Sequence, residues 1–166
     1  MTDTLTRQGQ LKKQFYRARI SLNDFEEATS FLAALKSTRR DVVRRALLTS
    51  AVIAYSRPFL NNERSHDSHA THRMRGNPTS VCTPEQKVVH ERVLKLRNEA
   101  IAHAQWSKYP VVLVQSNARG CVLRGRFFDI LGDAQVDARH FRDIAQLMHD
   151  HCVREIFDIN RRIADR

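Results

Sequence analysis

The chain has no long apolar segment. No run approaches the roughly 20 consecutive apolar residues that a helix needs to cross a bilayer, and the first twenty residues lack the hydrophobic stretch of a secretory signal. We therefore expect no membrane insertion and no secretion. The three cysteines, Cys82, Cys121 and Cys152, are odd in number and widely spaced. This pattern favours reduced thiols in a cytoplasmic protein over a disulfide framework.

Several motifs that mark enzymes are also missing. The sequence contains no glycine-rich phosphate loop and no G-x-S-x-G nucleophile elbow, and no pair of carboxylates stands out. Candidate metal ligands gather in two places: His66, His69, His72 and Cys82 in one, and His149, His151 and Cys152 in the other. Zinc needs three or four ligands in a tetrahedron, whereas the first group lies in a polar segment and the second includes adjacent helical positions that point apart. We predict no metal and no cofactor.

Basic residues, in contrast, are abundant. The formal net charge is +10, and 22 of the 28 basic residues are arginine. A positive excess of this size attracts polyanions and favours contact with nucleic acid. A genome rich in G and C also raises the arginine content, so the charge alone does not identify the partner.

Apolar residues recur at helical spacing in four stretches, which predict helices over residues 21–36, 41–56, 84–105 and 137–163. The second helix is apolar over most of its circumference beyond Arg45, so we expect it to be the central and most buried one. It should end at Arg57, because a residue that precedes proline disfavours the α conformation. Thr83 and Gln86 predict a capping box at the start of the third helix.

The remaining segments complete the predicted fold. Residues 1–20 are basic and weakly patterned, which indicates an arm or a short helix, and residues 60–82 form a polar loop with a composition typical of disorder. Two short strands, VVLVQ and GCVLRGRFF, are joined by a turn at residues 116–120. We therefore predict one domain over residues 21–166: an all-α, four-helix-type bundle with a small two-stranded β-hairpin insert before the last helix.

A group of arginines surrounds the start of the second predicted helix: Arg39, Arg40, Arg44 and Arg45. Positive charge at a helix N-terminus opposes the helix dipole. The group is either a nucleic-acid-binding patch or a solvated basic face, and the sequence leaves both open. Arg124 and Arg126 share one face of a predicted strand because side chains alternate with a period of two, and they are candidates to extend the patch.

The segment LRNEAIAH, residues 96–103, is the most informative stretch. The helical neighbours of Arg97 are all apolar (Val93, Leu94, Ala100 and Ile101), and a buried charge costs several kcal/mol, roughly, unless it is paired. Arg97 and His103 therefore form a candidate phosphate site. Alternatively, Arg97 extends from the helix flank to a core carboxylate, and His103 caps the helix C-terminus.

These residues resemble a known family. RNEAIAH resembles the R-x(4–6)-H signature of the HEPN superfamily (higher eukaryotes and prokaryotes nucleotide-binding domains), including a polar residue, here Asn98, directly after the arginine. The run AYSRPFLNN resembles the end of the second helix in bacterial HEPN-like proteins, and VVHERVLKLRNEAIAH resembles their signature helix. Together the matches cover about residues 21–163.

The resemblance implies an all-α core that often forms a homodimer, and active relatives are metal-independent endoribonucleases of toxin and phage-defence systems. Arg97 would then hold the scissile phosphate, Asn98 would orient it, and His103 would transfer a proton to or from the reacting oxygens. Some relatives act with an antitoxin protein. Many others lack nuclease activity, so two alternatives stay open: a catalytically silent dimer that binds nucleic acid or a nucleotide, and a helical module that binds another protein.

The spacing sets a geometric condition on this site. Residues six apart in a straight α-helix differ by about 120° around the axis and ~9 Å along it. Arg97 and His103 therefore converge only if the helix bends or ends near Ala102, or if each meets the site of a second subunit.

Overall fold

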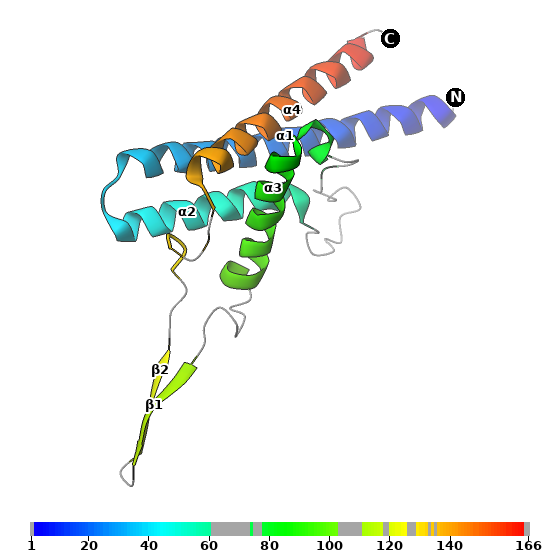
Figure 1. Ribbon diagram of the computed structural model, residues 1–166. Helices are drawn as coiled ribbons and strands as arrows, with labels where there is room; N and C mark the ends of the chain where they lie inside the picture. Colours follow the sequence, from blue (N-terminus) through cyan, green and yellow to red (C-terminus); the bar gives the residue numbers. More distant parts are fainter. Residues whose placement is uncertain are drawn as a thin grey trace.

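The computed structural model describes residues 2–60, 74, 78–102, 111–117, 120–125, 129–132, 134 and 136–164. Within these residues four α-helices pack into a bundle (Figure 1): α1 (Thr2–Ser37), α2 (Asp41–Ser56), α3 (Pro84–Leu96) and α4 (Ala138–Ala164). The predicted helical bundle is thus confirmed. None of the helices in the described part of the chain combines the length and the apolar character that a membrane span requires.

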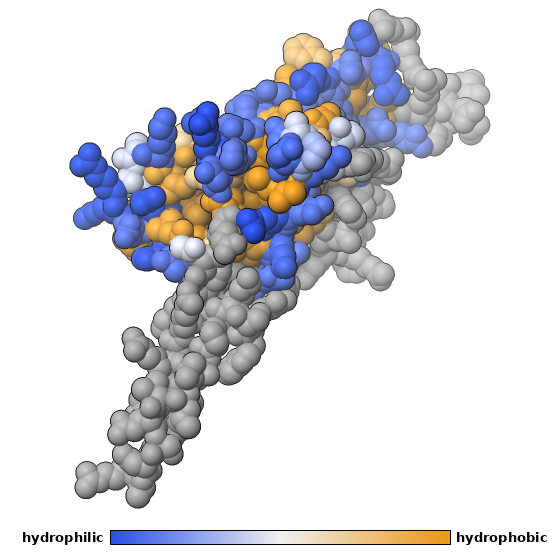
Figure 2. Space-filling model, in the orientation of Figure 1, coloured by the Kyte–Doolittle hydropathy of each residue, from blue (hydrophilic) through white to orange (hydrophobic). Residues whose placement is uncertain are grey.

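Helix α1 lies at the centre of the bundle and packs against both α2 and α4. The predicted apolar stripe of α1 is buried: Leu22, Phe25, Ala28, Leu32 and Leu35. Our prediction that residues 41–56 form the central helix is wrong, although the bounds of that helix are confirmed. Helix α2 is short and packs on one side of α1, and its first turn faces solvent, with Val42 72% exposed. Figure 2 shows hydrophilic residues over much of the face in view, with apolar residues visible among them.

Residues 2–20 form the N-terminal half of α1 and not a separate arm or short helix. Its buried residues repeat every seven positions (Leu11, Ala18, Phe25 and Leu32), as in a helix that packs along a second helix. Arg17 is also buried and interacts with the half-buried Glu155 of α4. Small and charged residues in this seam hide the pattern from a search for apolar stripes.

The end of α2 is fixed to α1 through an arginine. Arg57 follows α2 and opens the 3-10 turn η1 (Arg57–Phe59). Its Nη1 donates to the carboxylates of Asp24, at 3.1 Å, and Glu27, at 2.7 Å, while Pro58 is buried. The predicted helix end before this proline is confirmed, and the RPF sequence has a structural role here.

Helix α3 starts as predicted and ends earlier than predicted. The Thr83 hydroxyl accepts from the Gln86 N–H at 3.3 Å and the Gln86 side chain accepts from the Thr83 N–H at 2.9 Å, which completes the capping box. The α-helix stops at Leu96, and η3 (Arg97–Ala102) continues as a π-helix. A π-turn places one extra residue in the helical turn, and such turns are frequent at functional sites.

The connections are described in part. Met74 is buried, and its N–H donates to the Pro58 carbonyl at 2.8 Å. Together with the 3-10 turn η2 (Pro78–Val81), this gives parts of the predicted loop over residues 60–82 a defined place, whereas residues 61–73 and 75–77 lie outside the described residues. Between α3 and α4, strands β1 (Val111–Asn117) and β2 (Gly120–Gly125) run antiparallel.

Candidate functional site

Arg97 is the first residue of the π-helix and is half-buried. Its Nη1 donates to the Asn98 side-chain oxygen at 3.1 Å. Of its predicted apolar neighbours, Val93 is fully buried and Leu94 is half-buried, so the guanidinium emerges beside an apolar surface. Two residues further on, the Glu99 carboxylate lies 3.8 Å from the Lys95 ammonium group. His103 lies outside the described residues, so the predicted Arg97–His103 geometry stays a prediction.

The predicted arginine patch separates into residues with different surroundings. Arg45 is bound to Asp129 by two hydrogen bonds, Nε to Oδ1 at 3.0 Å and Nη2 to Oδ2 at 3.3 Å. The Arg45 hydrogen bond and the Leu131 N–H hold the pKa of the Asp129 carboxyl below its usual value. Arg45 therefore attaches α2 to the segment before α4. Arg40 is the exposed N-cap residue of α2, and its side chain makes no capping hydrogen bond.

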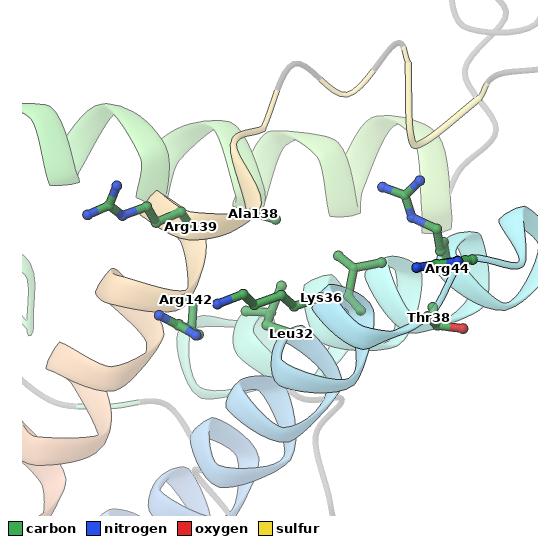
Figure 3. A pocket seen from close by; sticks show the side chains of 9 residues that line it. Leu32, Lys36, Thr38, Arg44, Ala138, Arg139 and Arg142 are labelled. Atoms are coloured by element: carbon green, nitrogen blue, oxygen red, sulfur yellow. The ribbon is translucent and has the colours of Figure 1, made fainter.

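The other two arginines line a cleft of about 860 Å³ between the end of α1, the start of α2 and the start of α4 (Figure 3). We call this site the basic cleft. Its cations are Lys36, Arg39, Arg44, Arg139 and Arg142, and its other described lining residues are Leu32, Leu35, Thr38 and Ala138. None of these lining residues is acidic. The cleft thus carries five positive charges, and the Leu32 and Leu35 that line it belong to the buried core.

Sequence reasoning placed Arg39 and Arg44 in a binding patch and missed the three other cations. Arg139 and Arg142 are exposed and stand in the first turns of α4. The available signal was their position, because cations near a helix N-terminus oppose the dipole just as Arg44 does in α2. Lys36, in the last turn of α1, is on the favourable end of its helix.

Two helix N-termini border the basic cleft. At α4 the Asp137 carboxylate caps the helix, accepting from the N–H groups of Arg139 at 2.8 Å and His140 at 3.0 Å. These hydrogen bonds lower the pKa of the Asp137 carboxyl. At α2 the side chain of Arg40 provides no such cap. Asp41 lies 3.7 Å from Arg44, while the Nε of Arg44 is buried without a hydrogen-bond partner among the described residues.

The basic cleft and Arg97 are separate places in the fold. The cleft lies where α1 turns into α2, whereas Arg97 follows the C-terminal end of α3 and is not among the residues that line the cleft. Of the remaining candidates, Arg124 belongs to β2, where its backbone pairs with Val112, and Arg126 lies outside the described residues. The predicted catalytic and nucleic-acid-binding residues therefore do not form one continuous site among the described residues.

In the described part of the chain, the cysteine and histidine side chains outside these two sites are buried or lie beside carboxylates. Cys82 and Cys152 are buried free thiols, and burial raises the pKa of the Cys152 thiol to about 12. No group of histidine, cysteine, aspartate and glutamate among the described residues is arranged to hold a metal ion. His149 lies 2.9 Å from the Asp150 carboxylate and 3.6 Å from that of Glu26, and His66, His69 and His72 lie outside the described residues.

No protein-family model, curated protein or solved structure matches this chain. The resemblance to the HEPN superfamily therefore depends on the sequence motifs alone. The basic cleft and the surroundings of Arg97 are the structural features that bear on function.

Proposed function

We propose that this protein binds nucleic acid, with RNA as the expected partner, and that the basic cleft contacts its phosphates. The observation that carries the proposal is that five cations, four on three helices and Arg39 in the connection between α1 and α2, line one cleft without an acidic residue among the described lining residues. Arginine matches phosphate geometry through paired N–H donors. The formal charge of +10 supports the same partner by attracting a polyanion at long range.

The surroundings of the cations favour an anionic ligand over a solvated face. Arg44, Arg139 and Arg142 lie near helix N-termini, where the backbone already carries partial positive charge. An anion in the cleft offsets this repulsion.

The test is equilibrium binding of a labelled single-stranded RNA at low salt, measured by fluorescence anisotropy. The variant Arg139→Gln/Arg142→Gln removes two cations of the cleft. The matched control, Arg161→Gln/Arg162→Gln, removes the same charge from exposed positions in the last turn of the same helix. Because charge-assisted hydrogen bonds contribute about 1.5–3 kcal/mol each and 1.4 kcal/mol is tenfold in affinity, we expect the cleft variant to bind at least about tenfold more weakly. Equal losses in both variants would contradict a defined site.

A second candidate function is RNA cleavage of the HEPN type. It is favoured by Arg97, which stands half-buried at the start of a π-turn with Asn98 hydrogen-bonded to it. In this function Arg97 binds the scissile phosphate, Asn98 orients it, and His103 transfers protons. Cleavage proceeds through the 2′-hydroxyl without a metal ion.

Incubation with structured RNA in EDTA tests this candidate. The expected result is cleavage that leaves a 2′,3′-cyclic phosphate and disappears in both Arg97→Ala and His103→Ala. Cleavage by both variants at the parent rate would exclude these roles. If the folded protein leaves the RNA intact, the cleavage function is excluded and nucleic-acid binding remains the proposed function.

We further propose that the protein is cytoplasmic and forms a homodimer, and that it belongs to a toxin or defence system with an antitoxin protein as a second partner. We also propose that β1 and β2 form a stable β-hairpin insert. Sedimentation of the purified protein tests the dimer. A monomer at the concentrations used for RNA binding would contradict the proposed homodimer.

A further inference from the structure

A second hollow continues from the basic cleft along the groove between α1 and α4. It has a volume of about 470 Å³ and is lined by Thr29, Ser30, Ala33, Arg142, Asp143 and Gln146. Arg142 lines both spaces. The two hollows are therefore neighbours, and a ligand held by Arg142 reaches into each of them.

The chemistry changes from one hollow to the next. The basic cleft offers cations, whereas the second hollow offers hydroxyl groups, an amide and the carboxylate of Asp143. These are the groups that hydrogen-bond a ribose or the edge of a base. The Thr29 hydroxyl is already bound to the Glu26 carbonyl at 2.9 Å, and the Gln146 amide to Asp150 at 2.8 Å, which leaves Ser30 and Asp143 as the principal contacts.

Further along the groove the surface becomes acidic. Beyond Gln146, the carboxylates of Glu26 and Asp150 flank His149. A second phosphate placed here would meet negative charge, so a phosphodiester chain cannot follow the α1–α4 groove with its phosphates in contact. The groove therefore suits one nucleotide, with its phosphate in the basic cleft and its sugar and base in the second hollow.

The number of cations indicates which phosphate this is. A phosphate monoester carries a charge between −1.5 and −2 near pH 7, roughly, whereas an internal diester carries a single charge. Five cations line one cleft, and a dianion uses this field better than a monoanion.

We infer that the basic cleft and the adjoining hollow bind the terminal nucleotide of an RNA through its phosphate monoester. The inference rests on the proposed nucleic-acid binding and adds an end preference to it. The same chemistry is present in a 5′-phosphate and in a 3′-phosphate.

The experiment compares one short RNA in three forms, with a 5′-phosphate, with a 3′-phosphate, and with hydroxyl groups at both ends, each labelled at an internal position. We expect one phosphorylated form to bind at least about tenfold more tightly than the hydroxyl form, and the arm that gains affinity identifies the end. Arg142→Gln should remove the preference, while Arg161→Gln should keep it. Ala33→Leu, which fills the exposed second hollow without changing charge, should also weaken it.

The outcomes separate this inference from the proposed function. Equal affinity for all three RNAs, together with a loss of affinity in the cleft variant, would overturn the end preference and leave nucleic-acid binding intact. A preference that persists in Arg142→Gln would place the terminal phosphate elsewhere. If none of the three RNAs binds, both proposals fail.

Discussion

The hydroxyl of Tyr55 provides a sharp test of the fold. Tyr55 is fully buried among the rings of Phe25, Phe59 and Phe141, at centroid distances of 5.6, 5.3 and 5.2 Å. Its hydroxyl lies 2.9 Å from the Nδ1 of His90. Burial lowers the pKa of His90 and raises that of Tyr55. The hydroxyl therefore stays protonated and the imidazole stays neutral, and the two groups share one hydrogen bond.

Replacement by phenylalanine removes this bond and little else. In Tyr55→Phe the Nδ1 of His90 remains buried without this hydrogen bond, and an unsatisfied buried polar atom costs about 1–3 kcal/mol. A loss of about 2 kcal/mol corresponds to a fall in Tm of roughly 4–8 °C for a protein of this size. Urea denaturation followed by circular dichroism measures the free energy of unfolding directly.

A control and a double variant complete the test. Tyr16 is 65% exposed, so Tyr16→Phe should change the free energy of unfolding by less than about 0.5 kcal/mol. Tyr55→Phe combined with His90→Phe removes both partners, and the double variant should lose less stability than the two single variants together. Unchanged stability in Tyr55→Phe, or strict additivity of the two changes, would refute this account of the core.

Three further predictions concern a helix cap, a buried base and a buried thiol. Asp137→Ala should lower the free energy of unfolding by about 1 kcal/mol, and Asp137→Asn should lower it less because the amide oxygen still caps α4; equal losses in urea titrations would contradict the cap. Burial lowers the pKa of His90. Below about pH 6.5 the His90 imidazole therefore binds a proton in the unfolded chain and stays neutral in the folded protein. Stability should therefore fall as the pH drops through this window, and more steeply in the parent than in His90→Asn; parallel pH profiles would remove His90 as the cause. The buried thiols of Cys82 and Cys152 should resist alkylation in folded Cys121→Ser and react only in denaturant, and mass spectrometry that finds either one labelled in the folded state would contradict their burial.

Local patterns in the sequence predicted the helices well. The bounds of α2 follow from its apolar residues and from the proline after Arg57, and the capping box at Thr83 depends only on residues three apart. The N-terminal half of α1 was missed because its buried seam includes Ala18 and the charged Arg17. Arg17 interacts with Glu155 of α4, and a local pattern does not contain the packing of α4 against α1.

The candidate site was predictable only in part for the same reason. Arg39 and Arg44 are near each other in the sequence and were assigned to one patch. Arg139 and Arg142 join them in the basic cleft through the packing of α4 against α1. The partner of Arg45 is Asp129, which the sequence places far from it, so the separation of Arg45 from the patch also depends on the tertiary fold. Likewise, no spacing rule predicted that Arg97 would begin a π-turn.

The salt dependence of RNA binding tests the central claim, that the basic cleft binds phosphate, most directly. For single strands, log K falls with log salt by about 0.7 for each phosphate that is neutralised. Removal of two cations in Arg139→Gln/Arg142→Gln should therefore reduce the slope by about 0.7–1.4 relative to the parent, while Arg161→Gln/Arg162→Gln should leave it nearly unchanged. An identical slope in the parent and the cleft variant, or an affinity that does not respond to salt, would contradict phosphate binding in the basic cleft.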